Sequence, residues 1–277
     1  MKKILLLLLA CSLTSIPGFA QDSETLTWTF DSATGTLRIS GTGERTNSSI
    51  DSSAPWRNVR SQIRQVEIGS DVANISYQSF SYSYSLTSIN VDSRNARYAS
   101  ENGVLFNKEK TTLICCPAGK SGSYTLPNSV TRIDDFAFFV CSNLTSVSIP
   151  NGVTSIGDHV FAGCRGLTSI AIPDGVKSIG NRAFYGCTGL VSVSIAGSVT
   201  SIGNLAFFDC RSLTSLLCWN PDPATVDSSV FEEVNKKACI LKVPAGSVKR
   251  YQQAPVWQDF SQIVAIEDSD SARRKTE

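Results

Sequence analysis

Three consecutive 23-residue segments of this 277-residue chain repeat one pattern of apolar residues, serine and glycine. They read LTSVSIPNGVTSIGDHVFAGCRG at 144–166, LTSIAIPDGVKSIGNRAFYGCTG at 167–189 and LVSVSIAGSVTSIGNLAFFDCRS at 190–212. A repeat of this period is typical of a solenoid, in which each unit forms one turn and buries its apolar side chains against the adjacent turns. A solenoid presents an extended surface rather than a pocket, so the pattern raises the question of what the chain binds before what it catalyses.

Each unit contains the signals of a short strand followed by a turn. In the first unit Val147 and Ile149 alternate with serines, which predicts a strand, and the following residues 150–152 (PNG) predict a turn. Gly157 predicts a sharp corner or a backbone with positive φ. Residues 158–164 are too few for a stable helix, so we expect one helical turn there.

The repeat extends beyond the three clean copies. Units in the same frame begin at residues 63, 86, 121, 144, 167, 190, 213 and 238, which predicts about eight turns, with the solenoid proper over 63–217. One step is longer than the others, and its extra residues lie at about 95–120. There the apolar runs 104–106 and 113–115 flank a polar segment, so we expect a hairpin added to one turn.

The two ends differ from the repeats and are predicted to be caps, because the open edges of a solenoid favour aggregation. Residues 21–62 are expected to form an N-terminal module, with a hairpin over about 26–39 and a short helical stretch that starts at Pro55. Residues 218–266 are expected to form the C-terminal cap, with a strand at 238–243 and a helix N-capped by Ser247. The last segment, 267–277, has the composition of a disordered tail.

The N-terminus has the features of an export signal. Two lysines precede an apolar run, and a Pro-Gly-Phe-Ala sequence ends at Ala20, so we predict a signal peptide over 1–20. In a competing interpretation, Leu8–Cys11 resembles a bacterial lipobox and Cys11 is lipidated. The formal net charge of +1 points to neither nucleic acid nor an anionic membrane, and no later segment is long enough to span a bilayer.

Eight of the nine cysteines follow the predicted signal. Four of them recur once per turn and are expected to form a ladder of buried thiols: Cys141, Cys164, Cys187 and Cys210. Their spacing of about 4.8 Å between stacked strands exceeds the Cβ separation that a disulfide needs. Cys218 and Cys239 flank an insertion and are candidates for a disulfide, whereas Cys115 and Cys116 are expected to point to opposite faces of a strand.

Catalytic and metal-binding residues are not predicted. The single histidine, His159, occupies a slot that holds Phe, Arg or Leu in other units, so we expect it to be exposed. Pairing with Cys164 as a nucleophile is disfavoured because Cys164 belongs to the thiol ladder. The sequence also lacks a zincin motif, a Cys/His metal cluster and a phosphate-binding glycine loop. We therefore predict a non-enzymatic chain without a cofactor.

Two groups of residues are candidates for a binding surface. The first is a tyrosine cluster interspersed with serines, which is either a partly exposed strand edge or an adhesive patch: Tyr77, Tyr82, Tyr84 and Tyr98. The second contains small, outward-facing strand residues that offer a flat face to a broad partner or to none: Asn90, Ser146, Ser148, Ser169, Ala171, Ser192 and Ser194.

The repeat motif LTSIxIPxGVxSIGxxAFxGC resembles that of the BspA-like (treponemal-type) leucine-rich-repeat proteins of bacterial surfaces, especially those of Bacteroidetes. The N-terminal LTWTFDSATGTLRISGTGE, the longer repeat ENGVLFNKEKTTLICCPAGK and the C-terminal LKVPAGSVKRYQQAPVWQDFSQI are similar to the corresponding parts of that family. Asp134 in place of the corner glycine and Ala196 in place of the strand-ending proline are small departures from the pattern.

Together, these features predict a β-rich leucine-rich-repeat solenoid of stacked parallel short strands with single helical turns. It is capped by an N-terminal β-hairpin and helix and by a C-terminal helix and strand. The resemblance implies an exported, non-enzymatic protein, at the cell surface, secreted or periplasmic, that adheres to or binds host-matrix or bacterial proteins. Alternatives on the same scaffold are a polysaccharide-binding module and an envelope component without an external ligand. We expect a monomer.

Overall fold

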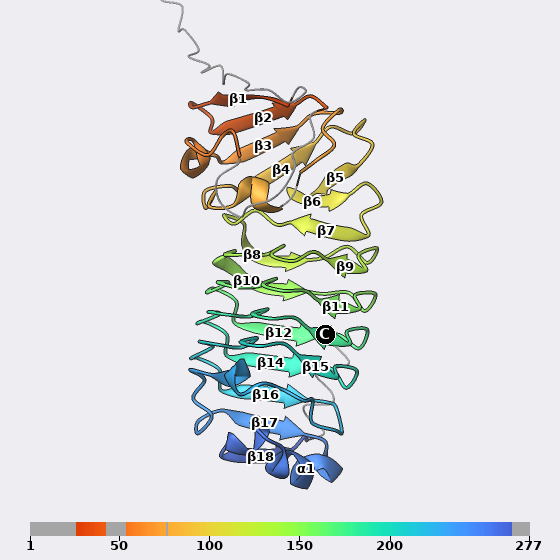
Figure 1. Cartoon of the computed structure of the whole chain (residues 1–277), viewed down its shortest axis with the longest axis vertical. Coiled ribbons are helices and arrows are strands. Elements are labelled where there is room, and N and C mark those ends of the chain that lie inside the picture. Colours follow the sequence, from red (N-terminus) through yellow and green to blue (C-terminus); the bar gives the residue numbers. More distant parts are fainter. Residues whose placement is uncertain (1–25, 43–53, 76, 268–277) are drawn as a thin grey trace, which may run out of the picture.

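The chain forms an elongated stack of turns (Figure 1) in a computed structural model that describes residues 26–42, 54–75 and 77–267. The predicted signal peptide, Cys11 and the tail 268–277 lie outside these residues. Each turn contributes one strand to a parallel column along one side of the stack, and this column consists of two separate hydrogen-bonded sheets, one of the strands up to residue 91 and one of the strands from residue 121 onward. The strands of this column are β2 (Thr36–Ser40), β3 (Gln65–Ile68), β4 (Ser88–Val91), β8 (Ser121–Thr125), β10 (Asn143–Ser148), β12 (Ser169–Ile172), β14 (Ser192–Ile195), β16 (Ser215–Cys218), β17 (Ile240–Val243) and β18 (Gln262–Ala265).

The repeat frame sets the register of this column. Ser146 pairs with Ser169, Ser169 with Ser192, and Ser192 with Ser215, so equivalent positions of successive units lie side by side. Each of the eight predicted units contributes one strand, from β3 to β17, and β18 adds a further turn. The predicted solenoid is therefore confirmed.

A second, narrower sheet runs along another side of the stack. It contains β11 (Ser155–Ile156), β13 (Ser178–Ile179) and β15 (Ser201–Ile202), with β9 (Arg132–Ile133) one turn earlier. Each of these two-residue strands buries its isoleucine and turns its first residue outward.

A third side is built from the segments 136–140, 159–163, 182–186 and 205–209, which we call the turn ladder. Phe161 N donates to Ala183 O of the next turn at 2.7 Å, and Phe184 N donates to Ala206 O at 2.8 Å. These four segments are hydrogen-bonded turns rather than helix. In the units that begin at 63 and 213, the expected helical turn is present as a single 3₁₀ turn, at Tyr77–Phe80 and Ser228–Phe231. Some backbone N–H groups of each segment donate to a carbonyl within the same segment, as Ala162 N does to His159 O, and others donate to the next turn of the solenoid.

A glycine precedes three of the four turn-ladder segments, at Gly157, Gly180 and Gly203, and it is needed there for close approach of the turns. A Cβ on Gly180 would lie 2.6 Å from the carbonyl carbon of Gly157 in the preceding turn. The positive φ angles fall two residues later, at His159 (+56°) and Arg182 (+52°). Of the two alternatives for these glycines, the sharp corner is therefore correct.

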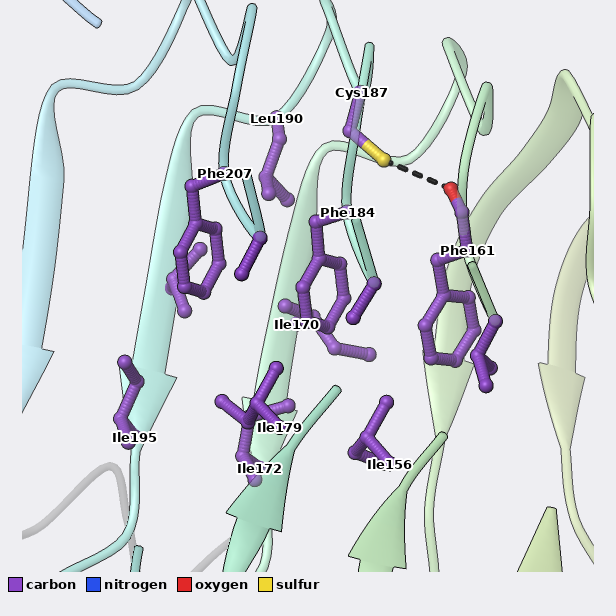
Figure 2. Packing of buried hydrophobic residues seen from close by; sticks show 14 of the residues in the cluster. Ile156, Phe161, Ile170, Ile172, Ile179, Phe184, Cys187, Leu190, Ile195 and Phe207 are labelled. Carbon is purple, nitrogen blue, oxygen red and sulfur yellow. Dashed lines mark hydrogen bonds between the residues drawn. The ribbon is translucent and has the colours of Figure 1, made fainter. Parts of the chain in front are cut away.

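Stacked phenylalanines fill the interior behind the turn ladder (Figure 2). Their ring centroids lie 4.9 to 5.6 Å apart along a column of five rings: Phe138, Phe161, Phe184, Phe207 and Phe231. The predicted thiol ladder runs beside them, and each thiol is buried. Cys187 Sγ, for example, donates to Phe161 O of the preceding turn at 3.0 Å.

The other four cysteines among the described residues are also buried free thiols. Cys218 and Cys239 are not joined in a disulfide. Cys115 packs in the core of the N-terminal turns and Cys116 in the core of the following ones, as expected for neighbours that point to opposite faces.

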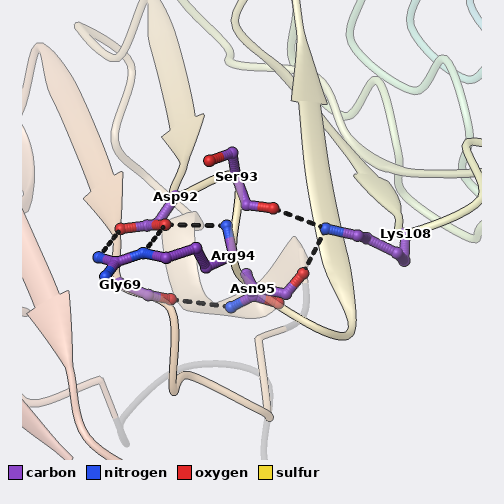
Figure 3. A network of polar contacts seen from close by, with 6 residues as sticks. All are labelled: Gly69, Asp92, Ser93, Arg94, Asn95 and Lys108. Carbon is purple, nitrogen blue, oxygen red and sulfur yellow. Dashed lines mark hydrogen bonds and ion pairs between the residues drawn. The ribbon is translucent and has the colours of Figure 1, made fainter.

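The lengthened turn carries an antiparallel insertion of three strands, β5 (Tyr98–Glu101), β6 (Val104–Asn107) and β7 (Thr112–Cys115). The hairpin expected from sequence corresponds to β6 and β7, and β5 adds a strand. A polar network fixes the insertion to the solenoid (Figure 3). The buried Asn95 amide donates to Gly69 O at 2.8 Å, and Lys108 Nζ donates to Ser93 O at 2.9 Å. Hydrogen bonds from Arg94 lower the pKa of Asp92 to about 2.

Both ends are capped. At the N-terminus β1 (Thr27–Asp31) and β2 form the predicted hairpin. The helical stretch after Pro55 is a turn followed by a 3₁₀-helix, η1 (Arg60–Gln62), which seats Trp56 in the core. The C-terminal cap contains η3 (Ser228–Phe231), η4 (Ala245–Ser247), α1 (Val248–Gln253) and η5 (Trp257–Asp259). Ser247 precedes α1, but its side chain makes no capping hydrogen bond, because it is the last residue of η4.

Candidate functional site

Exposed aromatic side chains gather on the side of the stack formed by the turn ladder. Among the described residues, the exposed large apolar side chains are Tyr82, Tyr84, Phe139, Tyr185, Val191 and Val264. Phe139 and Tyr185 belong to the turn ladder itself. Tyr82 occupies its left-handed position (φ +65°), which Gly163 and Gly186 fill in later turns. Phe139, Tyr185 and Tyr82 therefore lie on one side, and Tyr84 lies beside Tyr82, with its ring in edge-to-face contact. We call this side the aromatic flank.

Half-buried rings continue the flank between these exposed ones. In the 3₁₀-helix η2 (Tyr77–Phe80), Tyr77 stacks on Phe136 with ring centroids 4.6 Å apart, and Phe136 stacks on His159 at 4.5 Å. Tyr185 stacks on Phe208 at 4.8 Å. Rings stacked in this way cover one another's faces and turn their edges outward.

The tyrosine pair at the N-terminal end of the flank is held by an arginine. Tyr82 and Tyr84 meet edge to face at 6.1 Å, and the Arg60 guanidinium lies 4.6 Å from the centre of the Tyr82 ring. This cation–π contact orders the Tyr82 side chain. Tyr84 is the most exposed of the four aromatic residues, at 53%.

The predicted tyrosine cluster is thus divided by the structure. Tyr77, Tyr82 and Tyr84 lie on the aromatic flank, whereas Tyr98 lies on β5 and has a structural role. The Tyr98 hydroxyl accepts from Ile75 N at 2.9 Å and donates to Ala73 O at 3.0 Å. Sequence reasoning missed Phe136, Phe139, Tyr185 and Phe208 as parts of a surface. An aromatic residue directly after the buried phenylalanine in three units, at Phe139, Tyr185 and Phe208, was a usable signal.

The outward strand residues line a groove of about 670 Å³ on the long parallel column, which we call the serine groove. Its floor consists of outward side chains from β10, β12, β14 and β16, which include all of the predicted strand-face residues except one: Ser146, Ser148, Ser169, Ala171, Ser192 and Ser194. Asn90 lies on β4, outside the groove. The sequence did not indicate that Trp219, which donates from Nε1 to Ser194 Oγ at 3.1 Å, would line this groove.

His159 and Cys164 do not form a nucleophilic pair. Cys164 is buried, its Sγ donates to Phe138 O at 3.1 Å, and burial raises its pKa. His159 is half-buried in the ring stack rather than exposed as predicted. Burial and the nearby Arg182 lower its pKa. Within the described ranges, no group of three His, Cys, Asp or Glu side chains is placed to hold a metal ion.

The helices in the described part of the chain are all too short or too polar to cross a membrane.

Comparisons with known proteins agree on the repeat. A sequence profile described as a BspA type Leucine rich repeat region matches residues 45–121 and 114–237, in six copies. No curated protein sequence matches the chain.

Solved structures share the fold. A leucine-rich repeat protein from Eubacterium ventriosum is 21% identical, with 87% of this chain and 91% of that chain covered and a TM-score of 0.52. The pneumococcal vaccine antigen PcpA is also 21% identical, with 74% of this chain and 56% of that chain covered and a TM-score of 0.56. At this level of identity the likeness concerns the fold alone.

Proposed function

Because the chain belongs to the BspA-type leucine-rich-repeat family, we propose that it is an exported protein that binds another protein through its aromatic flank. In this proposal the protein works at the cell surface, in adhesion to host-matrix proteins or to other bacteria. The repeats supply a rigid scaffold, and the flank supplies the specificity.

The observation that carries the proposal is the clustering of exposed aromatic residues. Four of the six exposed large apolar side chains among the described residues are Tyr or Phe on this one side. Contiguous exposed apolar patches are uncommon on proteins without partners. Tyrosine, with tryptophan and arginine, dominates the residues that carry most of the binding energy in protein interfaces. The Arg60–Tyr82–Tyr84 group has this composition.

The turn ladder holds the side chains of the flank in an ordered arrangement before a partner binds. Its backbone is hydrogen-bonded from turn to turn, for example from Gly186 N to Phe208 O at 2.8 Å, and the half-buried rings are fixed by stacking. Side chains that are already ordered lose little conformational entropy when a partner docks. The flank is therefore suited to a protein surface with apolar side chains that fit between ring edges.

The export step of the proposal depends on the N-terminus. We favour cleavage after Ala20, which leaves Gln21 as the first residue of the mature chain. The mass of the mature N-terminal peptide distinguishes this product from a chain lipidated at Cys11. Surface labelling of intact cells tests the location, and a wholly protected protein would contradict a role in adhesion.

The binding proposal is tested by capture of partners on the mature chain from host-matrix proteins and bacterial surface extracts. Tyr84→Ser and Tyr185→Ser each remove one exposed ring from a different part of the flank. We expect each to weaken binding by about tenfold or more, since a central aromatic contact contributes about 2 kcal/mol. Val264→Thr removes an exposed apolar side chain away from the flank, on β18, and should bind like the parent.

Unchanged binding by both tyrosine variants would refute the assignment of the flank. If the mature chain captures no protein at all, the result would favour an envelope component without an external ligand.

A further inference from the structure

The serine groove has a chemistry that differs from the aromatic flank. Small hydroxylated side chains form its floor, in rows that follow the pairing of neighbouring strands: Ser146–Ser169–Ser192–Ser215 in one row and Ala171–Ser194–Leu217 in the next. Strands in such a sheet lie about 4.8 Å apart, so the row Ser146–Ser169–Ser192–Ser215 presents a hydroxyl at each step along the stack, whereas the next row carries one hydroxyl, at Ser194. Trp219 lines the groove beside Ser194.

The hydroxyls in the middle of the row Ser146–Ser169–Ser192–Ser215 are open to a ligand. The structure gives the Ser169 and Ser192 side chains no hydrogen-bond partner among the described residues, and Ser169 is exposed. A serine hydroxyl both donates and accepts, so a row of them matches a ligand whose own polar groups also do both. Each hydroxyl of a sugar ring likewise both donates and accepts hydrogen bonds.

The charge of the lining points to an uncharged ligand. Asp174 and Lys242 are its only charged residues, and their formal charges cancel. An anionic or cationic polymer would meet one unfavourable charge for each favourable one, whereas a neutral polymer meets no net field.

A polypeptide fits this surface less well. Serine and alanine are depleted in protein interfaces, and serine is under-represented among the residues that carry binding energy. Addition of a peptide strand requires a free sheet edge, but β12, β14 and β16 are each paired on both edges. The volume of about 670 Å³ lies in the range of sites for small ligands and short polymer segments.

We propose that the serine groove binds a segment of a neutral polysaccharide. The serine hydroxyls exchange hydrogen bonds with sugar hydroxyls, and the Trp219 indole packs against the apolar face of a sugar ring. This site is separate from the aromatic flank, so one chain engages a glycan on one side and a protein on another. The proposal does not depend on the flank, because the two surfaces share no residue.

The test uses a matched pair of substitutions in the mature chain. Ser169→Arg places a long side chain in the middle of the groove, and Ser155→Arg places the same side chain on β11, at an exposed strand serine outside the groove. Both variants change the net charge equally. Equal midpoints of thermal unfolding would show that neither substitution disturbs the scaffold.

Binding is measured on an array of neutral plant, fungal, bacterial and animal polysaccharides, with polygalacturonate and heparin as anionic comparators, followed by calorimetry with oligosaccharides of the polymer that binds. We expect a neutral polysaccharide to bind the parent and Ser155→Arg alike, and to bind Ser169→Arg at least about tenfold more weakly. Trp219→Ala should weaken binding, while Tyr84→Ser should leave it unchanged. Absence of binding to every neutral polysaccharide, preference for the anionic polymers, or equal binding by the two arginine variants would overturn the proposal. Loss of a captured protein on Ser169→Arg would overturn it in favour of a polypeptide ligand.

Discussion

The buried phenylalanine column predicts that two adjacent residues have opposite roles. Phe184 is fully buried and stacks on Phe161 at 5.2 Å and on Phe207 at 5.1 Å, whereas Tyr185 is 38% exposed and stacks only on Phe208. Replacing a buried phenylalanine with alanine costs about 3 to 5 kcal/mol. Because Phe184 loses contacts with rings on both sides, we expect Phe184→Ala to lower the free energy of unfolding by about 4 kcal/mol.

The same change at the neighbouring residue should have a small effect. Tyr185→Ala loses one stacking contact at the surface, so we expect a decrease of about 1 kcal/mol. Urea unfolding followed by tryptophan fluorescence and far-UV circular dichroism measures both values. The slope with denaturant should stay unchanged if the turns unfold together. A loss below about 1.5 kcal/mol for Phe184→Ala, or an equal loss for the two variants, would refute the assignment of the column as the core that holds the turns together.

Three further predictions follow from the close stacking of the turns and from the buried groups. Gly189→Ala should destabilise the protein by about 2 kcal/mol or more, because its Cβ would lie 2.2 Å from Arg165 O, whereas Gly246→Ala, with open space around it, should be neutral by the same urea assay. The eight buried thiols should react with a thiol reagent in the folded protein only at the rate of unfolding, and a mass two units lower than that of the reduced chain would contradict the absence of a disulfide. The folded pKa of His159 lies below its ordinary value of 6.5, so its contribution to stability is present above pH 6.5 and is lost as the pH falls through that value towards the folded pKa; relative to His159→Gln, the protein should therefore be less stable at pH 5 than at pH 7.

The period of the sequence predicted the scaffold because a 23-residue repeat fixes which residues lie side by side. Val147, Phe161 and Cys164 recur at constant spacing, and side chains that recur in this way stack on their own equivalents. The strand register and the ladder of buried thiols both depend on this one property. The N-terminal hairpin was predictable for a different reason, namely the alternation of apolar residues around a turn sequence.

The conformation of the turn ladder was not predictable from local preferences. The first left-handed position of its segments holds Phe136, His159, Arg182 and Leu205, of which only the histidine belongs to a residue type that is enriched at positive φ. Backbone hydrogen bonds to the next turn of the solenoid impose that conformation. The positive φ therefore results from the stacking of turns and not from the preference of each residue. The half-burial of His159 has the same origin, because its ring is covered by Phe136 of the preceding turn.

The candidate surfaces were predictable only in part. The strand-face serines were identified because they alternate with buried residues, but the groove that they line also depends on Trp219, which lies outside the clean repeats. Tyr98 was grouped with the other tyrosines by proximity in sequence, whereas its hydroxyl turns toward the backbone of residues 73 and 75. Proximity along the chain did not show which side of a turn each ring would occupy.

The central claim is that the aromatic flank is the protein-binding surface, and hydroxyl-radical footprinting of the mature chain with its captured protein partner tests it most directly. Exposed aromatic rings are modified readily in the free chain, so Tyr84, Phe139 and Tyr185 serve as internal probes. The account predicts that all three become protected in the complex, while Val264 on β18 keeps its reactivity. Unchanged modification of the three rings, with protection elsewhere on the stack, would contradict it.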